Sequence, residues 1–522
     1  MNDEKKTGSY YTPYDLIAFM MQYLENEQQD FSRVLEPSAG DGRFLSLLLK
    51  KATQIDAIEL FDEKVEDIRK NYVNTKLNVF QNDFIEYATG CEKKYSLIIG
   101  NPPYISAKLL KEGSLQKTRQ LCEVEGLSKG AMQNMWLAFV VGACRLLQPD
   151  GTMFYVLPME FLQVQYAEKL RNHLENYFNT IHIISFDKTV FTEIEQEICL
   201  VYLTNKQKRP KHIYYKIYED TNSQKPISIN LIKKNKPLSK WSNAILSDDE
   251  ISLLKDEGEK FTKIGQMGEI APGIVTGGNK FFILTEEKVK EYDCQKYVLP
   301  IVQKSSFIPN NKIEIDSDVI KHIKKNKKPV YLLNLAKETE ELPEKLKSYL
   351  EKIGDEKIGE TALKERFKCK NRTPWYGVPI VNKGQVVFFK RYDVLPRIYI
   401  NKMDIHTTDA GYHIRLKEEY DAASLVFCFF NSMTLAECEY NGRYYGGGVS
   451  ELVPSEFKNL TIPYRKVSRQ DVMELKRKFK EKAPLEEIVK FVNERTIRMD
   501  LSEGNVQKFE EIRLKLIRRR LG

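Results

Sequence analysis

Residues 35–44 read LEPSAGDGRF, and they join a strand pattern at residues 33–37 to a helix pattern that begins at Phe44. Glycines placed after a strand let the backbone turn sharply and approach a ligand closely. The dinucleotide-binding fingerprint needs a third glycine, but Leu45 stands at its position. The carboxylate of Glu36 is also a poor neighbour for a pyrophosphate, whereas it suits a cationic ligand. The loop therefore predicts a binding site for a positively charged cofactor.

Strand and helix patterns alternate on both sides of this loop between residues 12 and 200. The rhythm predicts an α/β fold with a doubly wound, mostly parallel sheet. A final strand at residues 197–204 follows the preceding one after only ten residues. Parallel crossovers need about a dozen residues or more, so this strand should run antiparallel. The strands are expected at residues 33–37, 56–60, 77–80, 95–100, 152–158, 180–186 and 197–204, and the helices from Thr12 and Phe44 onward and at residues 62–72, 131–147 and 160–177.

Composition narrows the class of protein. The chain has 522 residues, 42% of them hydrophobic and 30% charged, which suits a globular protein of two or more domains. No apolar run approaches the ~18 residues that a membrane span needs. The eight cysteines form no C-x-x-C pair, so neither a disulfide framework nor a metal site is expected. Without an apolar leader, a cytoplasmic location is expected.

Charged residues are distributed unevenly along the chain. Residues 1–200 hold 21 Lys and Arg against 28 Asp and Glu, whereas the remainder holds 60 against 45. This asymmetry suggests an acidic catalytic domain at residues 1–240 and a basic, polyanion-binding domain at residues 241–522. A well-solvated, lysine-rich surface explains the charge equally well. A hairpin extension and a linker are expected at residues 205–262. A mixed α+β region with strands near 281–285, 385–389 and 397–400 follows, and basic helices are expected at residues 468–520.

Two further acidic residues follow strand ends. Glu59 lies at the end of the second strand, where a carboxylate can accept hydrogen bonds from ribose hydroxyls. Asp83 ends the next strand, and it can accept an amino proton from an adenine while Phe84 packs on the ring face. A solvated glutamate and a helix N-cap are the structural alternatives for Glu59 and Asp83.

The sequence Asn101-Pro102-Pro103-Tyr104 follows the apolar strand at residues 96–100. Prolines fix the backbone and donate no N–H, so nearby carbonyls stay available as acceptors. The Asn101 side-chain oxygen and the Pro102 carbonyl can accept both hydrogens of an aromatic amine, which directs its lone pair toward a methyl donor. Tyr104 can stack on the base and hold it in line.

These motifs resemble the amino-group DNA methyltransferases, and closely the gamma-class, TaqI-like adenine-N6 enzymes of restriction-modification systems. The resemblance implies a class I methyltransferase sheet, S-adenosylmethionine as cofactor, flipping of the target adenine from double-stranded DNA, and a C-terminal α+β recognition domain. It assigns Thr12, Ala39, Gly40 and Pro103 to the cofactor, beside Glu36, Glu59, Asp83 and Phe84. Thr12, Pro13 and Asp15 also form a good helix start on their own.

The same resemblance suggests that Phe191 stacks on the flipped base, although Thr192 replaces the usual proline after it. A phenylalanine of the core is the structural alternative for Phe191. The C-terminal half matches more loosely. Basic residues interleaved with aromatics are what phosphate and base contacts require. The residues expected to contact DNA are Arg372, Lys390, Arg391, Arg443 and Tyr444.

Other functions stay open at this point. RNA and protein-glutamine methyltransferases also use Asn-Pro-Pro-Tyr, but the long basic C-terminal region favours DNA. Cytosine-N4 methylation shares the amine chemistry, although its enzymes more often carry Ser or Asp at the position of Asn101. A methyltransferase-like nucleic-acid binder and a methyltransferase fused to a nuclease are further alternatives. We expect a monomer that acts beside a cognate restriction endonuclease.

Overall fold

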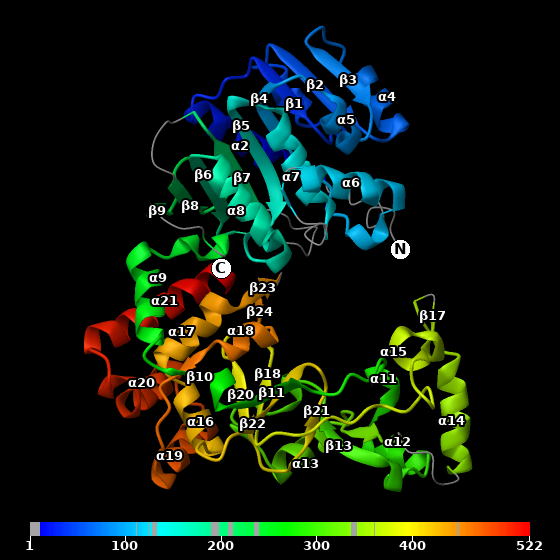
Figure 1. The fold of residues 1–522 in the computed structure, drawn as a ribbon, viewed down its shortest axis with the longest axis vertical. Coiled ribbons are helices and arrows are strands. Elements are labelled where there is room, and N and C mark those ends of the chain that lie inside the picture. Colours follow the sequence, from blue (N-terminus) through cyan, green and yellow to red (C-terminus); the bar gives the residue numbers. More distant parts are fainter. Residues whose placement is uncertain are drawn as a thin grey trace. The chain divides into compact units, whose positions relative to one another are not determined.

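The structure is a computed structural model that describes residues 11–110, 112–124, 126–127, 133–188, 198–206, 212–233, 238, 240–335, 342–359, 361–445 and 448–521. Two compact units follow one another, formed by residues 11–251 and by residues 252–444 with 448–520 (Figure 1). The division predicted after residue 240 falls inside the first unit. The reason is Trp241, which is fully buried edge-on against Phe161 and donates its indole N–H to buried Glu175.

A nine-stranded sheet forms the centre of the first unit, in the order β3-β2-β1-β4-β5-β7-β6-β8-β9. Strands β1 to β5 pair in parallel, and β7 is antiparallel to both β5 and β6, which confirms the predicted reversed strand. The predicted hairpin is β8 with β9. The strands are β1 (Arg33–Glu36), β2 (Gln54–Glu59), β3 (Leu77–Gln81), β4 (Tyr95–Gly100), β5 (Leu147–Pro158), β6 (Thr180–Phe186), β7 (Ile198–Thr204), β8 (His212–Tyr218) and β9 (Ser228–Lys233).

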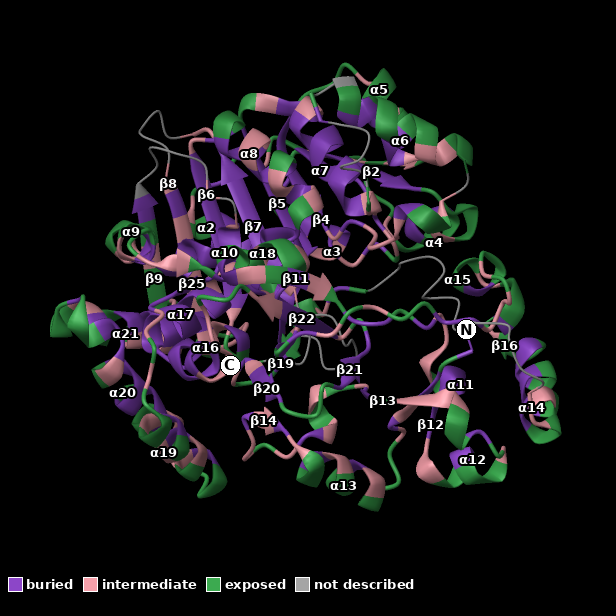
Figure 2. Cartoon of the chain, turned by 60° about the horizontal axis from the view of Figure 1, so that its bottom comes forward, coloured by how far each residue is buried: buried purple, intermediate pink, exposed green. Residues whose placement is uncertain are grey.

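Helices cover this sheet, and their buried stripes follow the 3.6-residue period. Residues such as Leu16, Met20 and Leu24 of the first helix are fully buried in a cluster with the strands. Figure 2 shows the central strands of this sheet largely in purple, the colour of buried residues. The helix α7 is buried along almost its whole length. The helices are α2 (Tyr14–Asn26), α3 (Leu45–Leu48), α4 (Asp62–Asn71), α5 (Phe84–Gly90), α6 (Glu112–Val124), α7 (Met135–Leu146) and α8 (Glu168–Tyr177).

One predicted helix is wrong in its first half. Residues 160–177 were expected to form a single helix, but the chain makes two short 3-10 turns, Met159–Leu162 and Gln165–Ala167, before α8 begins. The buried Arg171 explains the break, because its guanidinium donates to the carbonyls of Phe161 at 2.8 Å and Val164 at 3.0 Å. These carbonyls are satisfied by a side chain, so the backbone there does not continue a helix.

The second unit is α+β, as predicted, and contains a five-stranded sheet, a four-stranded sheet and a three-stranded sheet. Its sheets contain β11 (Gly268–Pro272), β22 (Gly411–Leu416), β18 (Val386–Phe389), β20 (Arg397–Asn401) and β14 (Glu314–Ile315); β12 (Ile283–Leu284), β15 (Tyr331–Leu333), β13 (Val298–Val302) and β21 (His406–Thr407); and β19 (Arg391–Tyr392), β24 (Val449–Glu451) and β23 (Arg443–Tyr445).

Shorter pairs complete the strands of the second unit, namely β10 (Thr262–Lys263) with β25 (Thr461–Ile462) and β16 (Lys357–Ile358) with β17 (Thr361–Ala362). Its helices are α9 (Asp248–Gly258, which begins in the first unit), α10 (Ile264–Met267), α11 (Asn279–Phe282), α12 (Glu286–Glu291), α13 (Ser317–Lys325), α14 (Glu344–Gly354), α15 (Phe367–Lys370), α16 (Ala422–Phe429), α17 (Ser432–Asn441), α18 (Pro454–Lys458), α19 (Arg469–Lys480), α20 (Leu485–Arg495) and α21 (Glu503–Leu521).

The predicted basic C-terminal helices are therefore present. The strand predicted at 281–285 is confirmed only for β12 at Ile283–Leu284. The turn of α11 occupies its first half, because Phe281 and Phe282 both face a buried cluster that a helical turn can reach. Within the described segments, none of the helices combines the length and apolar character needed to cross a bilayer.

Candidate active site

A cavity of about 380 Å³ lies where the parallel strands β1, β2 and β4 end. This is the position at which open α/β sheets bind ligands, where the strand order reverses between β1 and β4. The volume falls in the range of small-molecule sites. Nine residues proposed from the sequence line this one cavity: Thr12, Glu36, Ala39, Gly40, Glu59, Asp83, Phe84, Asn101 and Pro103.

The glycine loop is held against the second strand. Gly40 and Gly42 have φ angles of 60° and 78°, which glycine adopts without strain. The backbone N–H of Gly40 donates to the Glu59 carboxylate at 2.8 Å. The other oxygen of Glu59 accepts from the backbone N–H groups of Leu60 and Phe61. Glu59 thus fixes the loop geometry as well as facing the cavity, and it is not a solvated surface residue.

Glu36 is the most unusual group in the cavity wall. Only 1% of it is exposed, and one of its carboxylate oxygens has no hydrogen-bond partner among the described residues. Burial, helped by the charges of Asp41 and Glu59, raises the pKa of the Glu36 carboxyl well above its usual range. A buried carboxylate in the lining of a cavity suits a ligand that brings a positive charge.

Asp83 caps a helix and also lines the cavity. One carboxylate oxygen accepts the N–H of Ile85 at 2.8 Å, so Asp83 is the N-cap of α5, while the side chain also lines the cavity. Phe84 is 3% exposed and packs on Phe139 of α7 with ring centroids 4.7 Å apart. The pair forms an apolar wall on which a flat ring can lie.

Asn101 lies at the end of β4, and its side-chain amide donates to the hydroxyl of Thr12 at 3.2 Å. The backbone carbonyl of Asn101 accepts from Ser38 at 3.1 Å. Thr12 does not cap the first helix, because α2 starts one residue later than predicted and Pro13 occupies the cap position. Its buried hydroxyl instead ties the N-terminal segment to the Asn-Pro-Pro-Tyr motif.

Pro102 and Tyr104 do not line this cavity. Pro102 is buried. The Tyr104 hydroxyl donates to the carbonyl of Val156 on β5 at 3.2 Å, and burial raises the pKa of the hydroxyl well above its usual range. The ring is therefore anchored at its far end. Phe191 lies outside the described residues.

Sequence reasoning missed one linking residue. The Arg43 guanidinium forms a 2.7 Å ion pair with Asp41, donates to the backbone carbonyl of Thr12 at 2.6 Å, and lies over the rings of Tyr11 and Tyr14. Arg43 thereby holds the N-terminal segment over the glycine loop. Its place inside the quoted loop was the available signal, but its partners are fixed only by the fold.

The predicted DNA-contacting residues do not form one exposed surface. Arg391 and Lys390 both pair with the buried carboxylate of Glu451, at 2.9 and 3.8 Å. Arg443 pairs with Glu456 at 3.0 Å, and both side chains are largely buried. Tyr444 is 2% exposed beneath Arg519, whose guanidinium lies 4.7 Å from the ring centroid. The expectation that Tyr444 offers its ring to DNA does not match this structure, because the ring belongs to a packed interior.

Arg372 differs from these residues. Its guanidinium donates to the backbone carbonyls of Thr276 at 2.7 Å and Val275 at 2.9 Å. Burial lowers the pKa of the guanidinium. Arg372 therefore stabilises a surface loop, and its charge is already engaged by the protein backbone.

Comparison with known proteins identifies similar chains. Residues 35–191 match the family described as "Eco57I restriction-modification methylase", and residues 238–497 match "Type II methyltransferase M.Eco57I, C-terminal domain". The type II methyltransferase M.AccI of Acinetobacter calcoaceticus is 24% identical over 520 aligned residues, which cover 92% of this chain and 90% of that protein.

Two further proteins are similar to this chain, one over a short segment and one in fold. The tRNA1(Val) (adenine(37)-N6)-methyltransferase of Erwinia tasmaniensis is 37% identical over 81 residues, covering 14% of this chain and 33% of that protein. The solved structure of the type IIL restriction-modification enzyme MmeI in complex with DNA superposes with a TM-score of 0.63 at 14% identity. The superposition covers 98% of this chain and 79% of that one, so the two share a fold.

Proposed function

The chain belongs to the Eco57I-like restriction-modification methylases, and from that premise we propose that it transfers a methyl group from S-adenosylmethionine to the N6 amino group of adenine in double-stranded DNA. The observation that carries the proposal is the single cavity that Asn101 and the residues of the cofactor motifs line together.

The cavity walls fit S-adenosylmethionine group by group. Glu36 offers a buried negative charge to the ammonium and sulfonium end, near Thr12 and the glycine loop. Glu59 retains acceptor capacity for ribose hydroxyls beyond its backbone contacts, and Asp83 can accept an adenine amino proton. When bound, the cofactor supplies an electrophilic methyl group.

The methyl acceptor is activated by the chain's own oxygens. The Asn101 side-chain oxygen and the Pro102 carbonyl each accept a hydrogen bond from the target amine. These two hydrogen bonds draw its nitrogen toward tetrahedral geometry. The hydrogen bond that the Asn101 amide nitrogen donates to Thr12 fixes which end of the Asn101 side chain faces the amine. Tyr104, held through its hydroxyl by Val156, stacks on the extruded base, and we assign the second stacking face to Phe191. The base must leave the duplex to reach this site.

We assign cofactor binding and catalysis to the first unit and target recognition to the second. Specificity then requires residues that reach base edges. Of the predicted contacts we retain Arg443, Lys390, Arg391 and Arg372 as candidates, although each would have to exchange or extend its present contact to meet DNA. We also propose that the protein is a monomer, which sedimentation with and without duplex DNA tests. We further propose that it acts beside a separate nuclease.

The target base is tested by product analysis. The chain is incubated with plasmid DNA from a host without methyltransferases and with radiolabelled S-adenosylmethionine, and the labelled nucleosides are separated. N6-methyladenine is the expected product. N4-methylcytosine as the labelled product would mean that the target base is cytosine, methylated at the same site. Label found only in tRNA or protein would refute DNA as the substrate.

A further inference from the structure

The helix α15 and the loop at residues 275–277 are fastened together on the second unit. Arg366 donates to the carbonyl of Gly277 at 2.5 Å, and Arg372 donates to those of the two preceding residues. Gly277 has a φ of 84°, and a Cβ there would lie 3.1 Å from both Cys369 and Lys368. Two arginines and one close backbone contact therefore join this loop to α15.

On this surface the side chain of Phe367 is exposed beside two lysines. Phe367 is 70% exposed, the largest exposure of any described phenylalanine. Lys368 and Lys370 are exposed on the same helix, and neither forms an ion pair within the part of the chain that the structure describes. The Lys368 ammonium lies 5.9 Å from the Phe367 ring centroid. Val275, 40% exposed, adds an apolar edge. A single exposed apolar residue is common on protein surfaces, so it is the combination of this ring with Val275 and two lysines that makes the surface a candidate for docking.

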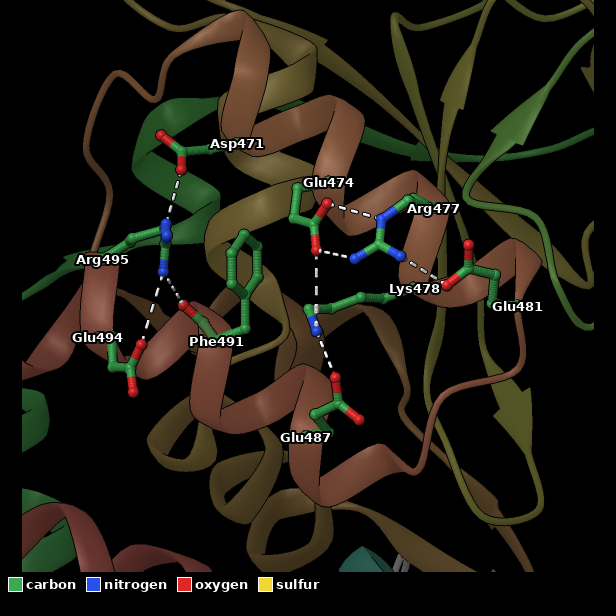
Figure 3. Close-up of polar contacts among 9 residues, drawn as sticks. All are labelled: Asp471, Glu474, Arg477, Lys478, Glu481, Glu487, Phe491, Glu494 and Arg495. Atoms are coloured by element: carbon green, nitrogen blue, oxygen red, sulfur yellow. Dashed lines mark hydrogen bonds and ion pairs between the residues drawn. The ribbon is translucent and has the colours of Figure 1, made fainter.

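Several cations of the terminal helices, by contrast, are paired within the chain. On α19 and α20, Arg477 is bracketed by Glu474 and Glu481, and Lys478 pairs with Glu487 (Figure 3). Arg495 likewise pairs with Asp471 at 2.6 Å and lies 3.9 Å from the Phe491 ring centroid. These cations neutralise carboxylates of the same hairpin, so they have little charge left for phosphates.

We propose that the surface formed by Val275, Phe367, Lys368 and Lys370 contacts duplex DNA, with the two lysines on phosphates and the Phe367 ring packed against a base step. The partner is argued from charge complementarity, because unpaired cations around an apolar ring fit a polyanion that also offers flat stacking faces. The inference rests on the proposed function and names residues that hold its substrate.

The lysines are tested by DNA affinity of the full chain. The probe is a fluorescent duplex of randomised sequence, measured by anisotropy over a series of salt concentrations. Replacing both lysines (Lys368→Gln with Lys370→Gln) should weaken binding and reduce the slope of log K against log[salt] by roughly 2, at about 0.9 per phosphate contact. The matched control replaces two exposed lysines at the end of α19, Lys480→Gln with Lys482→Gln, and should leave the slope unchanged.

The ring is tested separately from the charge. Phe367→Ala should lower the rate of methyl transfer to plasmid DNA by roughly tenfold or more, the scale of one lost stacking contact. The salt slope should stay as in the wild type, and Phe367→Tyr should restore the rate to within about twofold of it. Met473→Ala, at a 60% exposed apolar residue of α19, is the control.

The outcomes separate this surface from the proposed function. If the lysine pair matches its control in salt slope, or Phe367→Ala matches Met473→Ala while the wild type methylates DNA, the surface is refuted and the function stands. If the wild type transfers no methyl group to DNA, the function fails, and the lysine titration still decides whether this surface binds duplex. Unchanged thermal midpoints and cofactor affinity show that the variants are folded.

Discussion

The side-chain amide of Asn101 donates a hydrogen bond to the hydroxyl of Thr12, across 89 residues of sequence. An amide has one oxygen and one nitrogen, so using the nitrogen in this way leaves the oxygen as the group that can meet a substrate amine. The N-terminal segment therefore orients the proposed catalytic residue while also lining the cofactor cavity.

Replacing Asn101 with Ala should lower the rate of methyl transfer by about 100–1000-fold, because a preorganised acceptor is lost. Affinity for S-adenosylmethionine should change little, since the proposed role of Asn101 concerns the amine. Single-turnover transfer and calorimetry measure the two quantities. Retention of more than about a third of the wild-type rate would remove Asn101 from the catalytic machinery.

Thr12→Val should lower the rate less than Asn101→Ala does, because it removes the orienting hydroxyl but leaves the amide in place. Thr12→Ser, which keeps the hydroxyl, should stay near the wild type. Both variants are measured in the same single-turnover assay. Equal rates for Val and Ser would mean that the bond to Asn101 does not position it.

Glu36→Gln should weaken S-adenosylmethionine binding by roughly 1–3 kcal/mol, since the charge that meets the cationic end is removed. The raised pKa of Glu36 in the ligand-free protein adds a pH signature. Affinity of the wild type should rise with pH through that raised pKa as the carboxyl ionises, whereas Glu36→Gln should lack this rise. Calorimetry across pH measures both, and parallel pH profiles would contradict the assignment.

The same shift predicts the sign of a stability change. Because the folded-state pKa of Glu36 lies above its unfolded value, the folded protein binds this proton more tightly. Stability of the ligand-free protein should therefore fall as pH rises from the unfolded value through the folded one. Glu36→Gln should reduce this fall, which chemical denaturation at several pH values would detect.

Tyr104→Ala should lose most activity, at roughly 1–3 kcal/mol for one stacked base. Tyr104→Phe should retain most of it, because the hydroxyl contacts the Val156 carbonyl and not the cavity. A Phe variant that is as inactive as Ala, yet equally stable, would mean that the hydroxyl takes part in the reaction.

Arg520→Ala should destabilise the second unit by about 3–5 kcal/mol, because it leaves the carboxylate of Glu439 buried without its cation. Arg520 is fully buried in the pair, and it also donates to the carbonyl of Gly448. Arg518→Ala, at an exposed position of the same helix, should be nearly neutral. Denaturant titrations compare the two, and equal stability would contradict the buried-pair interpretation.

The sequence alone was sufficient for the first sheet and for most of the cavity. Local patterns determine these features, since strand ends, glycine turns and the Asn-Pro-Pro-Tyr motif all fall at carboxyl ends of parallel strands, which the fold brings to one edge. Even the reversed strand β7 followed from the length of one connection.

Tertiary structure decided which charges are available. Arg443, Arg477 and Arg495 look like DNA-binding residues in sequence, yet each of the three meets a carboxylate on another turn or element. Such partners lie at sequence separations that no local period encodes, and burial can place an aromatic such as Tyr444 inside while leaving Phe367 exposed. Net charge therefore predicted a polyanion partner, but only three-dimensional pairing of the ions showed where unpaired cations surround an exposed ring.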